Sequence, residues 1–229
     1  MDKSFRIYPA GDAALVIELG SRIDLQTNRQ VHHLASLLTQ ARLPGIGESV
    51  PAYASLMVHY DPAVLDYAAA TRWVEEHASQ LDSVPAFEPR RVDIPTVYGG
   101  EYGPDLAFLA EYHHITVETA IRLHSSAVYT VYMMGFTPGF PYLGGLPEEL
   151  ATPRLESPRT RVPAGSVGIA GSQTGIYPID SPGGWRIIGY TSLRLFIPQR
   201  EPPTLLAAGD QVRFIPISIQ DLSDASRGA

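Results

Sequence analysis

Short apolar runs with an alternating pattern mark out strands in the first third of the chain. Residues 5–8 and 14–19 alternate in this way on either side of a turn at residues 11–12, so they predict a hairpin. Residues 55–60 form a third apolar run of strand length. The pattern therefore predicts three strands in this region.

Two other stretches carry apolar residues at helical spacing. The first follows Asp24, whose carboxylate can accept hydrogen bonds from the free N–H groups of a helix start, and ends before Pro44. The second runs from Leu65 to about Leu81. Strands combined with helices of this kind predict a small α+β domain over residues 1–84.

The amino-acid composition of the chain changes after this domain. A proline-spaced segment at residues 84–89 resists both helix and central strand, and predicts a linker. Beyond it, Pro104 and Thr116 are typical of the first residues of short helices, and residues 127–133 predict a strand. Residues 135–184 hold 10 of the 20 glycines and 8 of the 20 prolines, which excludes long helices there.

The glycine- and proline-rich half also carries short apolar runs separated by turns, the pattern of a small barrel or sandwich. We therefore expect a mainly β domain over residues 90–218, with the two short helices packed on it. Residues 221–229 are polar and predict a frayed tail. The predicted strands of this half are residues 166–170, 176–179, 187–190, 193–197 and 211–215.

Charge and composition narrow the classes of function. The chain has 229 residues with 17 basic and 24 acidic side chains, a net charge of −7, which disfavours nucleic acid as a partner. It has no cysteine, no apolar run of the ~18 residues that a membrane span needs, and no apolar core of a signal peptide at its start. We therefore expect a cytoplasmic protein without membrane contact. Lys3 is the only lysine, so a lysine-bearing P-loop is excluded.

Arginine is concentrated in the second half of the chain. Six arginines lie between residues 154 and 200 against two acidic residues, a local charge of +4 that indicates an acidic ligand or partner. Arg159 and Arg161 flank Thr160, so an extended backbone would place both on one side, where they can clamp a carboxylate or a phosphate. Structural ion pairs in a solvated loop are the alternative.

Polar residues nearby extend this candidate site. Gln173 and Thr174 lie among closely spaced glycines, which permit turns whose N–H groups face an anion. Asp180 and Arg186 stand on either side of a Pro-Gly-Gly turn. There Asp180 can hold Mg²⁺ or move a proton, or it can cap the turn.

Aromatic residues accumulate in the same half. Phe136, Phe140 and Tyr142 lie in a segment too rich in glycine and proline for an ordinary core strand, and Tyr177 and Trp185 flank the Pro-Gly-Gly turn. Such rings can line a pocket or seal against a partner subunit. A rigid loop over one end of the barrel is the alternative, and both roles can coexist.

Histidine is absent from the glycine-rich half, since all seven histidines lie at or before residue 124. His124 ends the second short helix and is the best placed for proton transfer if folding brings it to the site; a packed or capping histidine is the alternative. The sequence contains neither a G-x-S-x-G serine motif nor a HExxH zinc motif, and the ligands of any metal stay open.

Four motifs taken together resemble one protein family. They are GGEYGPDL (99–106), LHS (123–125), VYMMGFTPGFPYLGGL (131–146) and PRTRVPAGSVGIAGSQTGIYPIDSPGGW (158–185), and the likeness extends through residues 6–18 and 50–62. This is the 5-oxoprolinase B-subunit family, also called allophanate hydrolase subunit 1 or the Kip-type histidine-kinase inhibitor family. The resemblance implies a small N-terminal α+β domain followed by a cyclophilin-like β-barrel.

The same resemblance implies an enzyme component that is active only with its partners, the A and C subunits of 5-oxoprolinase. Such an enzyme uses ATP, with Mg²⁺, to convert 5-oxoproline to glutamate. The roles assigned on this interpretation are phosphate or carboxylate binding for Arg159 and Arg161, hydrogen bonding for Gln173 and Thr174, and metal or proton handling for Asp180.

Two further points follow from the resemblance. Relatives have an arginine in the motif GRTPLRLF where this chain has Tyr190, and Arg186 is the expected replacement. Two other functions stay open for the family: a regulatory module that captures a segment of a sensor histidine kinase, and a component of an allophanate- or urea-processing hydrolase.

Overall fold

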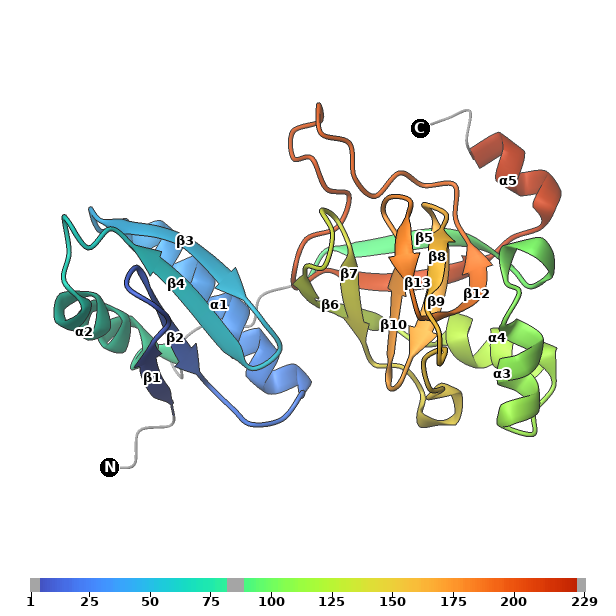
Figure 1. Ribbon diagram of the computed structural model, residues 1–229, viewed down its shortest axis with the longest axis horizontal. Coiled ribbons are helices and arrows are strands. Elements are labelled where there is room, and N and C mark those ends of the chain that lie inside the picture. The colour runs from blue at the N-terminus through green and yellow to red at the C-terminus, as the bar shows by residue number, and fades with distance from the viewer. Residues whose placement is uncertain (1–4, 82–88, 226–229) are drawn as a thin grey trace. The chain divides into compact units, whose positions relative to one another are not determined.

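The computed structural model describes residues 5–81 and 89–225. The chain divides into two compact units, Met1–Glu88 and Pro89–Ala229 (Figure 1). The two main hydrophobic clusters of the chain lie one in each unit. The predicted linker at residues 84–89 falls, except for Pro89, outside the described residues.

The first unit contains a four-stranded antiparallel sheet with strand order β1-β2-β4-β3. The alternation of apolar residues correctly predicted three of these strands. The segment IGESVP of β3 was not predicted, because it lies at the sheet edge and has no buried residue. The strands are β1 (Arg6–Pro9), β2 (Ala14–Glu18), β3 (Ile46–Pro51) and β4 (Ser55–Tyr60).

Two helices, α1 (Leu25–Ala41) and α2 (Tyr67–Ala78), cover one face of this sheet (Figure 1). Alternate residues of β2 and β4 pack with the apolar stripes of both helices into one core. Helix α1 begins where the sequence predicted, because the Asp24 carboxylate accepts the N–H groups of Gln26 and Thr27 at 2.9 and 3.2 Å.

Seven strands of the second unit close into a barrel in the order β10-β7-β6-β13-β5-β12-β9 (Figure 1). Strands β13 and β5 pair in parallel, and the other paired strands of the barrel are antiparallel. A separate two-stranded sheet joins β8 (Arg159–Val162) to β11 (Ser181–Gly183). The barrel strands are β5 (Arg91–Tyr98), β6 (Tyr129–Met134), β7 (Pro141–Gly144), β9 (Ser166–Ala170), β10 (Gln173–Ile176), β12 (Arg186–Tyr190) and β13 (Gln211–Pro216).

The helical pair packs on this barrel, as the sequence predicted. Helix α3 (Leu106–Tyr112) contacts β12, and α4 (Val117–Ser126) contacts β13 and α3. Thr116 caps α4, because its hydroxyl oxygen accepts the Thr119 N–H at 3.1 Å. Two short 3₁₀ turns, η2 (Gly100–Tyr102) and η3 (Glu148–Leu150), complete the connections.

Two strand predictions from short apolar runs were wrong. Residues 177–179 are loop, since β10 ends at Ile176 where a strand was expected to start. Residues 193–197 form no strand and contribute one isolated bridge, from Phe196 to Thr204. In both places a loop buries some of the apolar side chains, Tyr177 and Leu195 among them, and a short apolar run does not distinguish such a loop from a strand.

The predicted frayed tail is helical over its described part, as α5 (Ile219–Ala225). The reason is a reciprocal cap, in which the Ser218 N–H donates to Asp221 Oδ2 at 3.2 Å and the Asp221 N–H donates to Ser218 Oγ at 3.3 Å. Within residues 5–81 and 89–225, no helix has the length and apolar character needed to cross a membrane.

Candidate functional site

A cavity of about 370 Å³ opens on the second unit, within the roughly 300–1,000 Å³ typical of small-molecule sites. Three stretches far apart in the sequence line it, within residues 136–142, 154–158 and 182–185, together with Tyr177. The pairing of β7 with β10 and of β8 with β11 brings these stretches together. The lining includes the side chains of Phe136, Phe140, Tyr142, Tyr177, Trp185 and Arg154.

Phe140 lies at the centre of the aromatic walls. Its side chain is 1% exposed, and its ring centroid lies 5.0 Å from that of Tyr142 and 5.3 Å from those of Tyr177 and Trp185, all edge to face. Phe136 is 63% exposed and meets the Phe140 ring at 5.6 Å. The fold therefore gathers at one cavity all five aromatic residues that the sequence indicated for a pocket or a partner contact.

Glycines in the neighbouring strands permit this close ring packing. A Cβ on Gly183 would lie 2.3 Å from the Tyr177 hydroxyl oxygen, and one on Gly175 would lie 3.0 Å from both Phe140 Cζ and Trp185 Cζ3. No side chain fits at the first distance without displacing the ring. The glycine content that excludes long helices thus also lets backbone form part of the cavity wall.

Gly183→Ala is expected to push the Tyr177 ring out of the wall and to lower the free energy of unfolding by about 1–3 kcal/mol. Gly184→Ala is the matched control, because its Cβ would meet no atom closer than 3.7 Å. Urea unfolding of both variants measures the difference, and near-ultraviolet circular dichroism reports the ring displacement. Equal stability of the two variants would contradict the predicted steric conflict.

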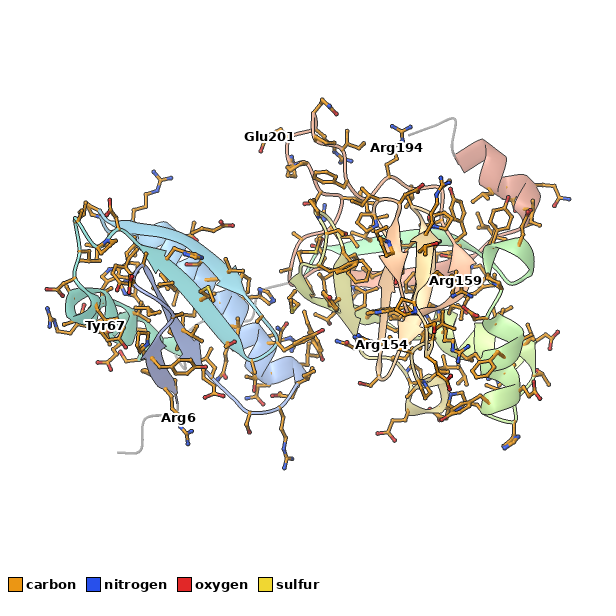
Figure 2. All side chains as sticks on the ribbon, viewed as in Figure 1. Arg6, Tyr67, Arg154, Arg159, Arg194 and Glu201 are labelled. Carbon is orange, nitrogen blue, oxygen red and sulfur yellow. The ribbon has the colours of Figure 1, made fainter. Side chains whose placement is uncertain are left out.

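Arg154 brings a positive charge to the cavity. Its side chain is exposed and forms no hydrogen bond or ion pair with the part of the chain that the structure describes. Burial raises the pKa of Tyr177, and the guanidinium charges of Arg154 and Arg159 oppose that rise. Figure 2 labels both arginines on the barrel unit. The cavity therefore combines aromatic walls with a positive potential.

Arg159, on β8, is bound to the protein itself. Its Nη2 donates to Asp105 Oδ1 at 2.9 Å, and its Nη1 donates to the Trp185 carbonyl oxygen at 3.4 Å. The other oxygen of the buried Asp105 carboxylate accepts the Ile187 N–H at 2.6 Å. This ion pair ties the start of α3 to β8 and β12.

Arg161 and Asp180 pair with each other at the surface. Arg161 Nε and Nη2 donate to Asp180 Oδ2 at 2.9 and 2.6 Å, and Asp180 Oδ1 accepts the Ala164 N–H at 2.9 Å. The Ala164 hydrogen bond, followed by those of Arg161, lowers the pKa of Asp180. Arg159 and Arg161, expected to form one clamp, thus bind different aspartates, and neither Arg161 nor Asp180 lines the cavity.

His124 and Thr174 meet in the barrel interior and are not among the residues that line the cavity. His124 is 1% exposed, with Nε2 3.0 Å from Thr174 Oγ1 and Nδ1 2.7 Å from the Tyr98 hydroxyl. Burial lowers the pKa of His124 from 6.5 to about 3. A neutral imidazole in this position anchors α4 to the barrel.

Gln173 and Arg186 lie at strand starts and also outside the cavity lining. Gln173 begins β10 opposite Ala170. Arg186 begins β12, where its Nε donates to the Pro153 carbonyl oxygen at 3.3 Å and its guanidinium carbon lies 3.8 Å from the centroid of the Phe108 ring.

Sequence reasoning overlooked three residues that matter for this site. Arg154 was counted among the six arginines but not singled out, since no motif marks it. Asp105 and Tyr98 were missed because they lie 54 and 26 positions from their partners, Arg159 and His124. Contacts of such separation leave no local pattern in the sequence.

The described residues offer no evident metal site or glycine-loop anion site. No three histidine, aspartate or glutamate side chains among them come together in a way that can hold a metal ion. The N–H groups of Gly165 and Gly171, expected to face an anion, donate to the carbonyl oxygens of Tyr177 and Thr152 at 2.7 and 2.8 Å. These two N–H groups are therefore not available to an anion.

Comparison with known proteins identifies the family. The family model "Carboxyltransferase domain, subdomain C and D" matches residues 5–206. The chain is 45% identical to the 5-oxoprolinase B subunit of Bacillus subtilis, over 96% of each chain, and 47% identical to the protein of that name from Haemophilus influenzae, over 91% of this chain and 96% of that one. The solved structure of TTHA0988 is similar with a TM-score of 0.79 at 38% identity, over 90% of this chain and 40% of that one. This chain therefore belongs to the 5-oxoprolinase B-subunit family, within the carboxyltransferase domain proteins of subdomains C and D.

Proposed function

We propose that this chain is the B subunit of an ATP-dependent 5-oxoprolinase, which acts with the A and C subunits to convert 5-oxoproline to glutamate. The names of relatives that match nearly the whole chain at 44–47% identity support the family role. The observation that carries the proposal is the cavity itself, in which aromatic walls adjoin the guanidinium of Arg154.

The proposed substrate suits a cavity of this kind. 5-Oxoproline is a compact five-membered lactam that bears one carboxylate. Aromatic walls can hold the flat ring and exclude water, while a guanidinium can bind the carboxylate through two parallel hydrogen bonds. A lactam is a stabilised amide, so the enzyme needs ATP: phosphorylation of the carbonyl oxygen makes the carbon electrophilic enough for ring opening by water.

The described residues do not by themselves fit ATP with Mg²⁺. Both oxygens of the Asp180 carboxylate already accept hydrogen bonds, from Arg161 and from the Ala164 N–H, so a cation would have to displace them. The cavity offers one guanidinium, fewer donors than a triphosphate requires. In the proposed assembly, the A and C subunits supply the nucleotide site.

Two observations support a role in a larger assembly. Phe136 is 63% exposed and lies at the cavity beside the other rings, where a partner chain can cover it. The chain spans 40% of the length of TTHA0988, so the same fold occurs there joined to a further stretch of polypeptide. A companion polypeptide that closes over the cavity accounts for both.

Reconstitution tests this proposal. The chain is mixed with the A and C subunits, 5-oxoproline and ATP, and glutamate and ADP are measured together. We expect both products in equal amounts, and little of either when any one component is left out. Unchanged glutamate formation without this chain would reject its role in the enzyme.

Two further experiments test the other functions that the family leaves open, which are allophanate processing and regulation of a sensor histidine kinase. Allophanate replaces 5-oxoproline in one arm, and faster turnover with allophanate would reassign the substrate. In the other arm, the chain is tested for binding to a sensor histidine kinase. Kinase binding without ring-opening activity would reassign the chain to regulation.

A further inference from the structure

We infer that Arg154 binds the carboxylate of the substrate at the aromatic cavity, and that it thereby selects cyclic acids over neutral lactams. This inference rests on the proposed function, because it takes 5-oxoproline as the substrate. It assigns the binding role to an arginine that the sequence motifs did not single out.

The arginines near the cavity differ in what they bind. Arg159 binds Asp105, Arg161 binds Asp180, and Arg186 lies over Phe108 with a bond to the Pro153 carbonyl oxygen. Among the described residues, Arg154 is the one arginine that lines the cavity, and it has no carboxylate partner there. Its guanidinium is therefore available for a ligand.

A backbone hydrogen bond holds the segment that carries Arg154. The next residue, Leu155, donates its N–H to the Gly184 carbonyl oxygen at 2.8 Å, and both residues line the cavity. The backbone next to Arg154 is thus attached to the Pro-Gly-Gly turn, which supplies part of the lining. The side chain starts from a fixed point while its guanidinium stays free.

The cavity lining does not balance the charge of Arg154. None of the described residues that line the cavity is acidic, so nothing there neutralises Arg154. Arg159 contributes little to this potential, because its guanidinium is paired with the Asp105 carboxylate at 2.9 Å. A carboxylate is the anion that a single planar guanidinium recognises well, through two parallel N–H···O bonds.

The aromatic walls favour a ligand that carries its carboxylate on a small apolar ring. The walls are the rings of Phe140, Tyr142, Tyr177 and Trp185, packed edge to face and supported by glycine backbone. Phe140 and Tyr177 are each 1% exposed and back the lining, so the apolar ring surface open to a ligand is that of Phe136 and Tyr142, with a small part of Trp185. A small ring with one carboxylate matches both the walls and Arg154, whereas a polyphosphate matches neither.

Fluorescence of Trp185 tests the inference in the full-length chain. The sequence has two tryptophans, so a Trp73→Phe background leaves Trp185, which lines the cavity, as the sole reporter. 5-Oxoproline and 2-pyrrolidinone, the same ring without the carboxylate, are titrated separately. We expect saturable binding of 5-oxoproline that weakens by about tenfold or more in Arg154→Gln and recovers in part in Arg154→Lys.

The matched control is Arg194→Gln, which removes the same charge from the loop between β12 and β13. Figure 2 shows Arg194 well separated from Arg154, so this variant is expected to bind 5-oxoproline like the parent chain. Thermal unfolding of all variants confirms that they are folded. The expected preference for 5-oxoproline over 2-pyrrolidinone disappears in Arg154→Gln alone.

Three results would overturn the inference: no saturable signal, equal affinity of the parent chain and Arg154→Gln, or equal binding of the two ring compounds. The reconstituted assembly keeps this failure apart from failure of the proposed function. Normal turnover with an unchanged KM in Arg154→Gln would remove the role of Arg154 and leave the function standing. Absence of turnover in the unmodified assembly would instead reject the function.

Discussion

Phe140→Ala is expected to lower the free energy of unfolding of the second unit by about 3–5 kcal/mol. The Phe140 ring is 1% exposed and belongs to a buried cluster with Tyr177, Trp185 and Val162. Its neighbours meet it edge to face and are themselves fixed by packing, so they cannot move far enough to fill the void. Urea unfolding followed by Trp185 fluorescence in the Trp73→Phe background measures the loss.

Phe136→Ala is the matched control for this prediction. Phe136 lies in the same loop, but it is 63% exposed, and its replacement is expected to change stability by at most about 0.5 kcal/mol. The two phenylalanines thus separate a structural ring from a ring that remains available for a partner. A comparable loss in both variants would show that Phe136 also supports the fold.

The second unit is expected to lose stability when the pH falls from 6.5 to about 3, by about 1.4 kcal/mol per pH unit from His124 alone. Burial lowers the pKa of this imidazole to about 3 in the folded chain. In that pH window the unfolded chain binds a proton at His124 and the folded chain does not. The free energy of unfolding therefore falls on acidification, and above pH 6.5 this residue adds no slope.

The hydrogen bonds around His124 agree with a neutral ring. The Thr174 hydroxyl donates to the Gly168 carbonyl oxygen at 3.0 Å, so its oxygen is left to accept from His124 Nε2–H. Nδ1 then carries the lone pair and accepts from the Tyr98 hydroxyl. Protonation of Nδ1 would set two donors against each other.

Unfolding free energies measured between roughly pH 5 and 6.5 test this prediction, because few carboxylates titrate in that range. In His124→Gln, the slope of the unfolding free energy against pH is expected to fall by about 1.4 kcal/mol per pH unit, which corresponds to one proton. Tyr98→Phe is the control: it removes one hydrogen bond but leaves the ring buried, so it is expected to lower stability while keeping most of the slope. An unchanged slope in His124→Gln would show that His124 does not bind its proton differently in the two states.

Local pattern predicted those parts of the fold that depend on neighbours in the sequence. The apolar period located β2, β4 and α1, and capping chemistry located the helix starts at Asp24 and Thr116. Strand β5 was not predicted. Residues of β5 pair with β13, and the ion pair of Asp93 with Arg213 spans 120 positions, so their environment is set by a remote segment.

Some residues of the candidate site could be predicted from local sequence, and others could not. The aromatic residues could be named in advance because they accumulate in glycine- and proline-rich segments, and all five lie at one cavity. The expectation that the first of these segments forms no core strand was wrong, since Tyr142 lies on the barrel strand β7. The polar residues could not be ranked. His124 and Thr174, plausible as catalytic groups by type, support the barrel interior, and the pair of Arg161 with Asp180 lies outside the cavity lining.

The sequence by itself determined the periodicity of the helices and strands, the positions of the caps and the family membership, since each is encoded in adjacent residues. Only the tertiary structure decided which arginine lines the cavity without a carboxylate partner among the described residues. The sequence alone does not distinguish Arg154 from Arg159. In the fold, Asp105, which lies 54 positions before Arg159, forms an ion pair with it and offsets its charge. The charge that a side chain presents to a ligand depends on the nearest opposite charge in space, and here the packing of β8 beside the start of α3 sets that distance.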